Sequence, residues 1–159
     1  MKVKKMYKQA FSLIEIIVAL ILFALLMAIG IPKLSKMLYN NSVKAQAEKI
    51  LNSGRQIAQA VIAYKTEKGA FPANLNELLP SYLDEIPSVK IGSSTITPSL
   101  NADYLNFGNN TKKDFVVEFD GVPQDVCQKA QELLPGKAKC DTSSTTNTLY
   151  YLIVPDYSS

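Results

Sequence analysis

The hydrophobic and polar positions divide the chain into a long apolar stretch, an amphipathic stretch and a mixed remainder. Residues 11–31 form 21 consecutive positions at which Ser12 and Glu15 are the only strongly polar side chains. A helix of that length rises about 30 Å, which matches the hydrocarbon core of a bilayer. The pattern therefore predicts a helix that can span a membrane.

The helical pattern continues beyond this stretch in a different form. Apolar residues recur at three- and four-residue steps with charged residues between them, which predicts an amphipathic helix; they include Ala47, Ile50, Leu51, Ile57, Ala58 and Val61. Together the two stretches predict one helix from about residue 11 to about residue 66. Gly30 and Pro32 lie at the join, where a missing side chain and a missing backbone donor weaken the helix. We expect a helix kink there.

The remainder predicts a small antiparallel sheet with short helices. Gly69 and Pro72 end the long helix, because glycine suits a left-handed cap and proline cannot continue the turn. Leucines between Pro72 and Pro87 permit one short helix, and residues 88–110, rich in Ser, Thr, Asn and Gly, read as a connecting region. Strand patterns occupy residues 104–107, 115–119 and 149–154, with the faintest alternation in the first.

Two cysteines lie in the C-terminal part of the chain. Pro123 precedes a helical pattern over residues 124–134 that contains Cys127, and Cys140 falls in the predicted loop before the last strand. In an exported chain, two cysteines with twelve residues between them indicate one disulfide. Two separate buried thiols are the alternative. A bridge would tie the helix to that loop.

The net charge of +3 belongs to the first ten residues. Lys2, Lys4, Lys5 and Lys8 lie there without an acid, and the rest of the chain carries 13 basic and 14 acidic side chains. The basic balance therefore does not indicate a nucleic-acid surface on the folded part, and nucleic-acid binding is left open. By the positive-inside rule these lysines keep the N-terminus in the cytoplasm and place the C-terminal part outside.

The composition offers little for catalysis. The chain has no histidine and two cysteines, and it shows no glycine-rich phosphate loop or paired ligand motif. We therefore predict no enzymatic activity, no catalytic residue, no metal site and no cofactor.

Glu15 needs an explanation, because a carboxylate inside a membrane-spanning segment costs about 2.5 to 3.5 kcal/mol on insertion scales. A protonated or interfacial glutamate near the membrane surface is one interpretation. The neighbouring residues favour another. Lysines, then Gln9-Ala10-Phe11-Ser12-Leu13-Ile14-Glu15 and an apolar run, form a string that resembles the class III signal of type IV prepilins and the related pseudopilins.

The resemblance implies specific processing. In that family a membrane peptidase cleaves before the first apolar residue and methylates the new N-terminus, which here implies cleavage between Ala10 and Phe11 and methylation of Phe11. Glu15 and Pro32 then occupy the fifth and twenty-second mature positions, where the family places its acid and its helix kink. Glu15 would meet the N-terminal amine of an adjacent subunit and set the register of assembly, since a buried carboxylate is least costly beside a cation.

Two features depart from the family pattern. The family prefers glycine before the cleavage site, where this chain has Ala10, so slower processing is expected. The last predicted strand also lies after Cys140, whereas much of the final sheet lies between the cysteines in many single-disulfide pilins. Gly121-Val122-Pro123 resembles the type IVb branch, while the ten-residue leader and the phenylalanine start resemble type IVa, so that assignment stays open.

The sequence thus predicts a pilin-like α+β fold, in which a long N-terminal helix packs on a small antiparallel sheet. The expected parts are a cleaved basic leader at 1–10, a transmembrane and polymerisation helix at 11–32, an amphipathic half at 33–68 and a globular head at 69–159.

The resemblance implies a filament subunit of a type IV pilus used for adhesion, motility or DNA uptake. A pseudopilin of a type II secretion system is the main alternative, and a membrane-anchored domain of another class is the third. The implied partners are other pilin subunits, the inner membrane, the prepilin peptidase, an assembly platform and its ATPase. The implied locations are the bacterial inner membrane before assembly and a periplasm-spanning or extracellular filament afterwards.

Overall fold

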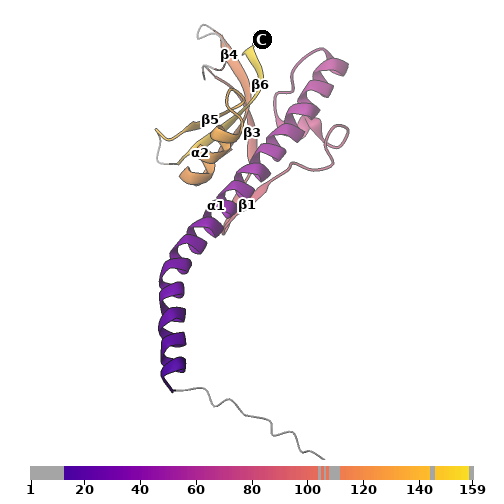
Figure 1. Ribbon diagram of the computed structural model, residues 1–159. Helices are drawn as coiled ribbons and strands as arrows, with labels where there is room; N and C mark the ends of the chain where they lie inside the picture. Colours follow the sequence, from indigo (N-terminus) through magenta and orange to yellow (C-terminus); the bar gives the residue numbers. More distant parts are fainter. Residues whose placement is uncertain (1–12, 104, 106, 108–111, 144–145, 158–159) are drawn as a thin grey trace, which may run out of the picture. The chain divides into compact units, whose positions relative to one another are not determined.

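The structure is a computed structural model that describes residues 13–103, 105, 107, 112–143 and 146–157 (Figure 1). It contains two α-helices, one 3-10 helix and six strands within those residues: α1 (Leu13–Lys68), η1 (Leu75–Leu78), β1 (Val89–Ile91), β2 (Ser94–Ile96), β3 (Pro98–Asp103), β4 (Lys113–Asp120), α2 (Gln124–Leu133), β5 (Ala138–Asp141) and β6 (Thr148–Tyr157). The chain divides into two compact units, Met1–Asn40 and Asn41–Ser159.

The second unit contains the part of α1 that has an apolar stripe. Ala47, Ile50, Ile57 and Val61 are fully buried, and the charged residues between them are exposed. This spacing of three and four residues places the buried side chains on one face of the helix. The helix ends before Gly69, whose φ of +78° is the left-handed conformation that glycine adopts without strain.

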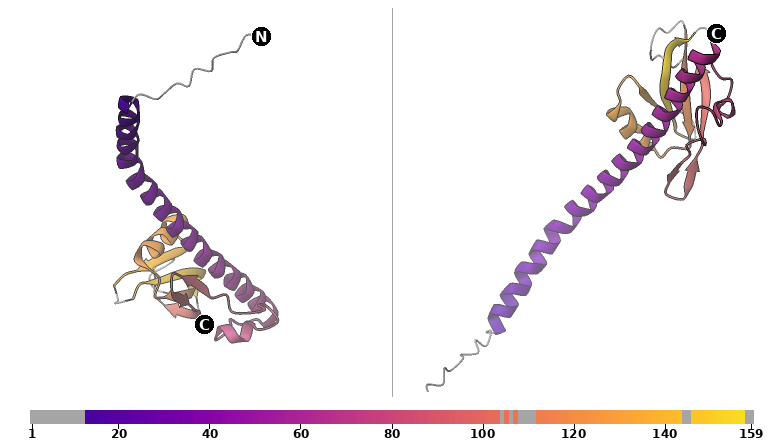
Figure 2. Two further views of the ribbon diagram at one scale, coloured as in Figure 1. Left: turned by 90° about the horizontal axis from the view of Figure 1, so that it is seen from below. Right: turned by 90° about the vertical axis from the view of Figure 1, so that its right-hand side faces the viewer.

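Four antiparallel strands in the order β3-β4-β6-β5 form the main sheet. Alternate residues of the two central strands point towards the core, and they meet in register: Val117 lies opposite Tyr151 and Phe119 opposite Leu149. These side chains form one buried cluster with the apolar stripe of α1 and with α2. Both views of Figure 2 show the second part of α1 running beside this sheet.

The other face of the sheet is mixed in character. Val116 lies opposite Leu152 and both are buried outside the main core, while Glu118 lies opposite Tyr150 in the next outward-facing pair. Burial raises the pKa of the Tyr150 hydroxyl, and the nearby carboxylate of Glu118 raises it further.

The prediction of a connecting region at 88–110 is wrong, because most of it forms strands. β1 and β2 make a hairpin in which Val89 pairs with Ile96, and β3 follows as an edge strand. The hairpin turns at Gly92, where φ is +59°. β3 begins at Pro98, the first position of an edge strand, where no sheet hydrogen bond is lost to proline.

The strand expected at 104–107 is also wrong for the residues described there. Leu105 and Phe107 lie outside any strand, and Tyr104 and Asn106 fall outside the described residues. Leu105 donates its N–H to the Asp103 carbonyl at 3.0 Å, just after the end of β3. Asp114, only 1% exposed, accepts N–H bonds from Phe107 at 2.9 Å and from Asp156 at 3.2 Å, and so connects Phe107 to the end of β6.

The other elements agree with the sequence analysis. The strands expected at 115–119 and 149–154 are present in β4 and β6, and the helix at 124–134 is α2. The short helix between Pro72 and Pro87 is the single 3-10 turn of η1, which the Asn74 side chain caps by accepting the Asn76 N–H. The predicted fold class, a long N-terminal helix packed on an antiparallel sheet, is confirmed.

Candidate functional site

The first part of α1 is an apolar helix without cover in the described chain. Large apolar side chains from Leu13 to Ile31 are between 46% and 77% exposed. The 19 residues from 13 to 31 rise about 28 Å as a helix. This helix is long and apolar enough to cross a membrane. So large an apolar surface is stable only when lipid or other apolar helices surround it.

Glu15 is the one ionisable residue of this surface among residues 13–32. It lies in the first turn of α1 and is exposed. One turn further along, Val18 and Ala19 occupy the same helix face, so an environment that covers the apolar helix also covers the carboxylate. In that environment the charge needs a cation or a proton.

The other predicted N-terminal residues are placed only in part. Ala10 and Phe11 lie outside the described residues, so the cleavage and methylation positions stay predictions. Gly30 and Pro32 lie within α1, whose helical backbone continues through both. The kink expected at these two positions also stays a prediction.

The seven residues that follow Pro32 combine apolar and basic side chains. Leu34, Met37, Leu38 and Tyr39 are between 57% and 64% exposed. Lys33 and Lys36 are exposed among them, and at a spacing of three residues they share one face of the helix. We call residues 33–39 the basic collar of α1.

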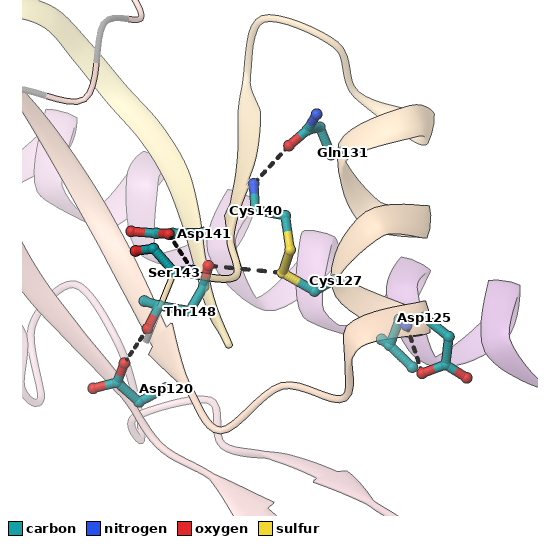
Figure 3. The surroundings of a disulfide bond; sticks show 9 residues. Asp120, Asp125, Cys127, Gln131, Cys140, Asp141, Ser143 and Thr148 are labelled. Carbon is teal, nitrogen blue, oxygen red and sulfur yellow. Dashed lines mark hydrogen bonds between the residues drawn. A yellow bond between two sulfur atoms is a disulfide. The ribbon is translucent and has the colours of Figure 1, made fainter. Parts of the chain in front are cut away.

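In the second unit, the structure brings Cys127 of α2 and Cys140 of β5 together (Figure 3). Their Cα atoms are 5.5 Å apart, and their Sγ atoms are bonded. Cys140 lies in the strand β5, so its predicted placement in a loop before the last strand is wrong. β5 pairs with β6, so the bridge connects α2 directly to the main sheet.

Hydrogen bonds fix the surroundings of the bridge. The Gln131 side chain accepts the Cys140 N–H at 2.7 Å, and the Thr148 hydroxyl donates to Asp120 at 2.7 Å (Figure 3). The bridge thus lies in a region held on both sides, by α2 and by the neighbouring strand. That arrangement makes it a structural link between elements.

Two tyrosines connect the C-terminal end of α1 to the segment after it. Tyr82 donates its hydroxyl to Glu67 at 2.6 Å, and Tyr64 donates to Glu77 at 3.1 Å. The Glu67 hydrogen bond, then desolvation, raises the pKa of Tyr82 to about 12, and the Tyr82 bond lowers the pKa of Glu67. The tyrosine rings contact each other edge to face, with centroids 5.4 Å apart.

No pattern in the sequence predicted these tyrosine and glutamate pairs or the hydrogen bonds of Asp114. The partners of each pair are 13 and 15 positions apart, across a helix end and a loop, so no periodic pattern connects them. Asp114 did leave a signal, since it is an acid next to the apolar residues of a clear strand pattern. Within the described residues, no group of three or more His, Cys, Asp or Glu side chains could hold a metal ion.

The fold and the apolar surface together define an α+β protein whose first helix must be covered by lipid or by other helices. Residues 5–31 match the family described as the prokaryotic N-terminal methylation motif. This class III signal is the hallmark of type IV pilins and pseudopilins, and the long helix with its antiparallel sheets is consistent with a pilin-like fold. No curated protein and no solved structure gives a significant match to the chain.

The motif implies the main steps of the protein's processing and assembly. It implies processing by a prepilin peptidase and assembly into pilus-like filaments. Together with the apolar helix it fits anchoring in the inner membrane before assembly. Pilins and pseudopilins, of which this motif is the hallmark, are structural subunits.

Proposed function

We propose that this protein is a filament subunit of a type IV pilus, used for adhesion, motility or DNA uptake. The observation that supports the proposal most is the coincidence of the methylation motif at residues 5–31 with a helical surface that is exposed and apolar over nearly the same residues. A secreted soluble domain would expose this apolar surface to water, whereas a polymer of helices buries it.

The proposed assembly uses two environments that both accept the apolar helix. In the membrane the helix from Leu13 to Ile31 is surrounded by lipid, and in the filament the same surface contacts the helices of other copies. Because both environments are apolar, moving between them changes the free energy little. A cytoplasmic ATPase acting through a membrane platform then sets the direction.

The proposed maturation prepares the helix for assembly. Prepilin peptidase removes residues 1–10 by cleavage between Ala10 and Phe11, and the new amine of Phe11 is methylated. Residues 11–32 then form the polymerisation helix and 33–68 its amphipathic continuation. Glu15 of one copy meets the Phe11 amine of the next copy, so a subunit in the wrong register leaves both charges without a partner in an apolar bundle.

A deletion strain tests this function. Cells that lack the gene should have fewer surface filaments in electron micrographs and in the sheared fraction, and a plasmid copy should restore them. A pseudopilin of a type II secretion system would carry the same N-terminal motif. Unchanged filaments together with failure to release a secreted enzyme would contradict the pilus assignment and favour that second function.

A further inference from the structure

The charged residues next to the polymerisation helix need partners that the described chain does not provide. Lys33 and Lys36 of the basic collar are exposed, and neither makes an ion pair or hydrogen bond with any described residue. When the preceding apolar helix enters a bundle of copies, the collar enters with it. The two ammonium groups then leave water or lipid headgroups and require anions from protein.

Suitable anions lie beside a groove on the second unit. Gln56, Gln59, Ala60 and Ala63 of α1 line one side of this groove, and residues between 80 and 87 line the other. Asp84 and Glu85 lie on the loop side and are exposed. No described residue pairs with either carboxylate. We call this feature the acidic groove.

The acidic groove is better oriented for contact with another helix than Glu118, another acidic residue of the second unit. It includes the side of α1 that the sheet leaves uncovered, whereas Glu118 projects from the sheet face opposite the core that α1 joins. Ala63 is small and exposed, and a small side chain allows another helix to approach closely. The collar supplies large side chains, such as Met37 and Leu38, to contact such a surface.

The charges of the two surfaces are complementary. Residues 33–40 carry two positive charges and no negative charge. Residues 41–159 carry 11 basic and 13 acidic side chains, a net charge of −2. This difference in sign favours contact between the collar of one copy and an acidic surface of another, and charge complementarity of this kind fixes orientation and register.

We propose that the basic collar of one copy docks in the acidic groove of a second copy, with Lys33 and Lys36 paired to Asp84 and Glu85. This contact rests on the proposed filament function and adds a second register device to the Glu15 pair. It determines which part of a neighbouring head each helix passes, whereas Glu15 acts at the N-terminal ends.

Charge exchange in a deletion strain tests the contact. One variant carries Lys33→Glu with Lys36→Glu, a second carries Asp84→Lys with Glu85→Lys, and a third carries all four substitutions. Each two-residue variant should reduce the sheared-filament yield by about tenfold, because like charges then face each other across the interface. The four-residue variant should recover to within about threefold of wild type, since the pairing is restored with reversed polarity.

A matched control separates this effect from a general change of charge. Lys90→Glu with Lys137→Glu changes the net charge as much as the collar variant does, at two exposed positions of the second unit outside the groove. It should assemble like wild type. A membrane blot for processed subunit must show equal amounts in all strains.

The outcomes distinguish the two proposals. If the wild-type copy restores no filaments, the filament function fails and the contact fails with it. If wild type assembles but either two-residue variant does so equally well, or the four-residue variant shows no recovery, the contact alone is wrong. Loss of membrane retention in the collar variant, with no effect of the groove variant, would mean that the lysines bind anionic lipid, which also overturns the contact.

Discussion

Gly54 of α1 lies directly against the ring of Tyr151 of β6. A Cβ atom at position 54 would be 2.7 Å from Tyr151 Cγ and 2.9 Å from Cδ2, closer than nonbonded carbon atoms can lie. Tyr151 is 7% exposed, so its ring has little room to move away. The missing side chain of Gly54 therefore determines how closely the long helix approaches the sheet.

Replacing Gly54 by alanine should destabilise the second unit. Alanine favours a helix by about 1 kcal/mol over glycine, but overpacking a core costs about 1 to 3 kcal/mol and also shifts the helix. We expect Gly54→Ala to lower the urea midpoint of the purified protein in detergent. Lys49→Ala, at an exposed position of the same helix, should leave the midpoint nearly unchanged. An equal or higher midpoint for Gly54→Ala would contradict this packing.

The long helix and the central strands could be predicted because their patterns are strong. Residues 11–31 have an apolar content that only a membrane or a bundle accepts, and Phe115, Val117 and Phe119 alternate at the period of a strand. These elements form the middle of the fold, where burial dictates the residue types. Their sequence therefore carries most of the information.

The two edge strands of the main sheet, β3 and β5, were missed because most of their residues are only half buried or exposed. β3 is Pro98–Asp103, and its Ser, Asn and Asp residues have low strand propensity, so pairing with β4 holds them in the sheet. The β1–β2 hairpin did leave a signal, since Val89, Ile91 and Ile96 flank the Gly92-Ser93 turn. Cys140 was assigned to a loop because β5 has four residues and only Ala138 among them is fully buried.

The disulfide should form in the exported protein and should stabilise it. Closing a loop of this size contributes about 3 kcal/mol to the free energy of unfolding. Mass spectrometry of protein alkylated without reductant should find Cys127 and Cys140 joined. The Cys127→Ser, Cys140→Ser variant should unfold at lower urea. Two alkylated thiols in material from wild-type cells would contradict both the bridge and the periplasmic exposure of this part.

The hydrogen bond between Tyr82 and Glu67 should be visible in a titration of the tyrosines. The pKa of Tyr82 is raised to about 12, so the stabilisation from this bond is fully present below pH 10 and is lost as pH rises through 12. The pKa of Glu67 is lowered, so its contribution is present above pH 4.5 and is lost as pH falls through its folded value. Both limits follow from the same bond.

Tyrosinate absorbance measures this directly, because the chain has eight tyrosines and no tryptophan. Tyr82→Phe should remove the component that ionises near pH 12, and Glu67→Gln should move that component towards pH 10. Glu132→Gln, on an exposed part of α2, serves as the control and should change nothing in this range. If the tyrosinate absorbance of Glu67→Gln at high pH follows that of wild type, the bond does not form in solution.

Glu15→Leu should spare membrane insertion and leader removal but impair assembly. The change deletes the charge from the apolar helix, so insertion becomes easier by about 2.5 to 3.5 kcal/mol. In a filament it leaves the neighbouring N-terminal amine unpaired, at a penalty of about 3 to 5 kcal/mol.

A membrane blot for processed subunit and a sheared-filament assay in the same strain separate these effects. Glu48→Leu, the same substitution at an exposed and ion-paired position of α1, controls for loss of a carboxylate and should assemble. Normal filament yield from Glu15→Leu, expressed without a wild-type copy, would show that the carboxylate has no role in register.

The central claim is that the chain loses its leader and then polymerises through the helix that follows it. Mass analysis of the N-terminal peptide from sheared, washed filaments of wild-type cells tests this most directly. We expect a peptide that begins at Phe11 and carries one added methyl group on its amine. Filaments whose subunits retain Met1, or begin within the apolar helix near Ala28, would rule out both the proposed cleavage and polymerisation through the helix that follows it.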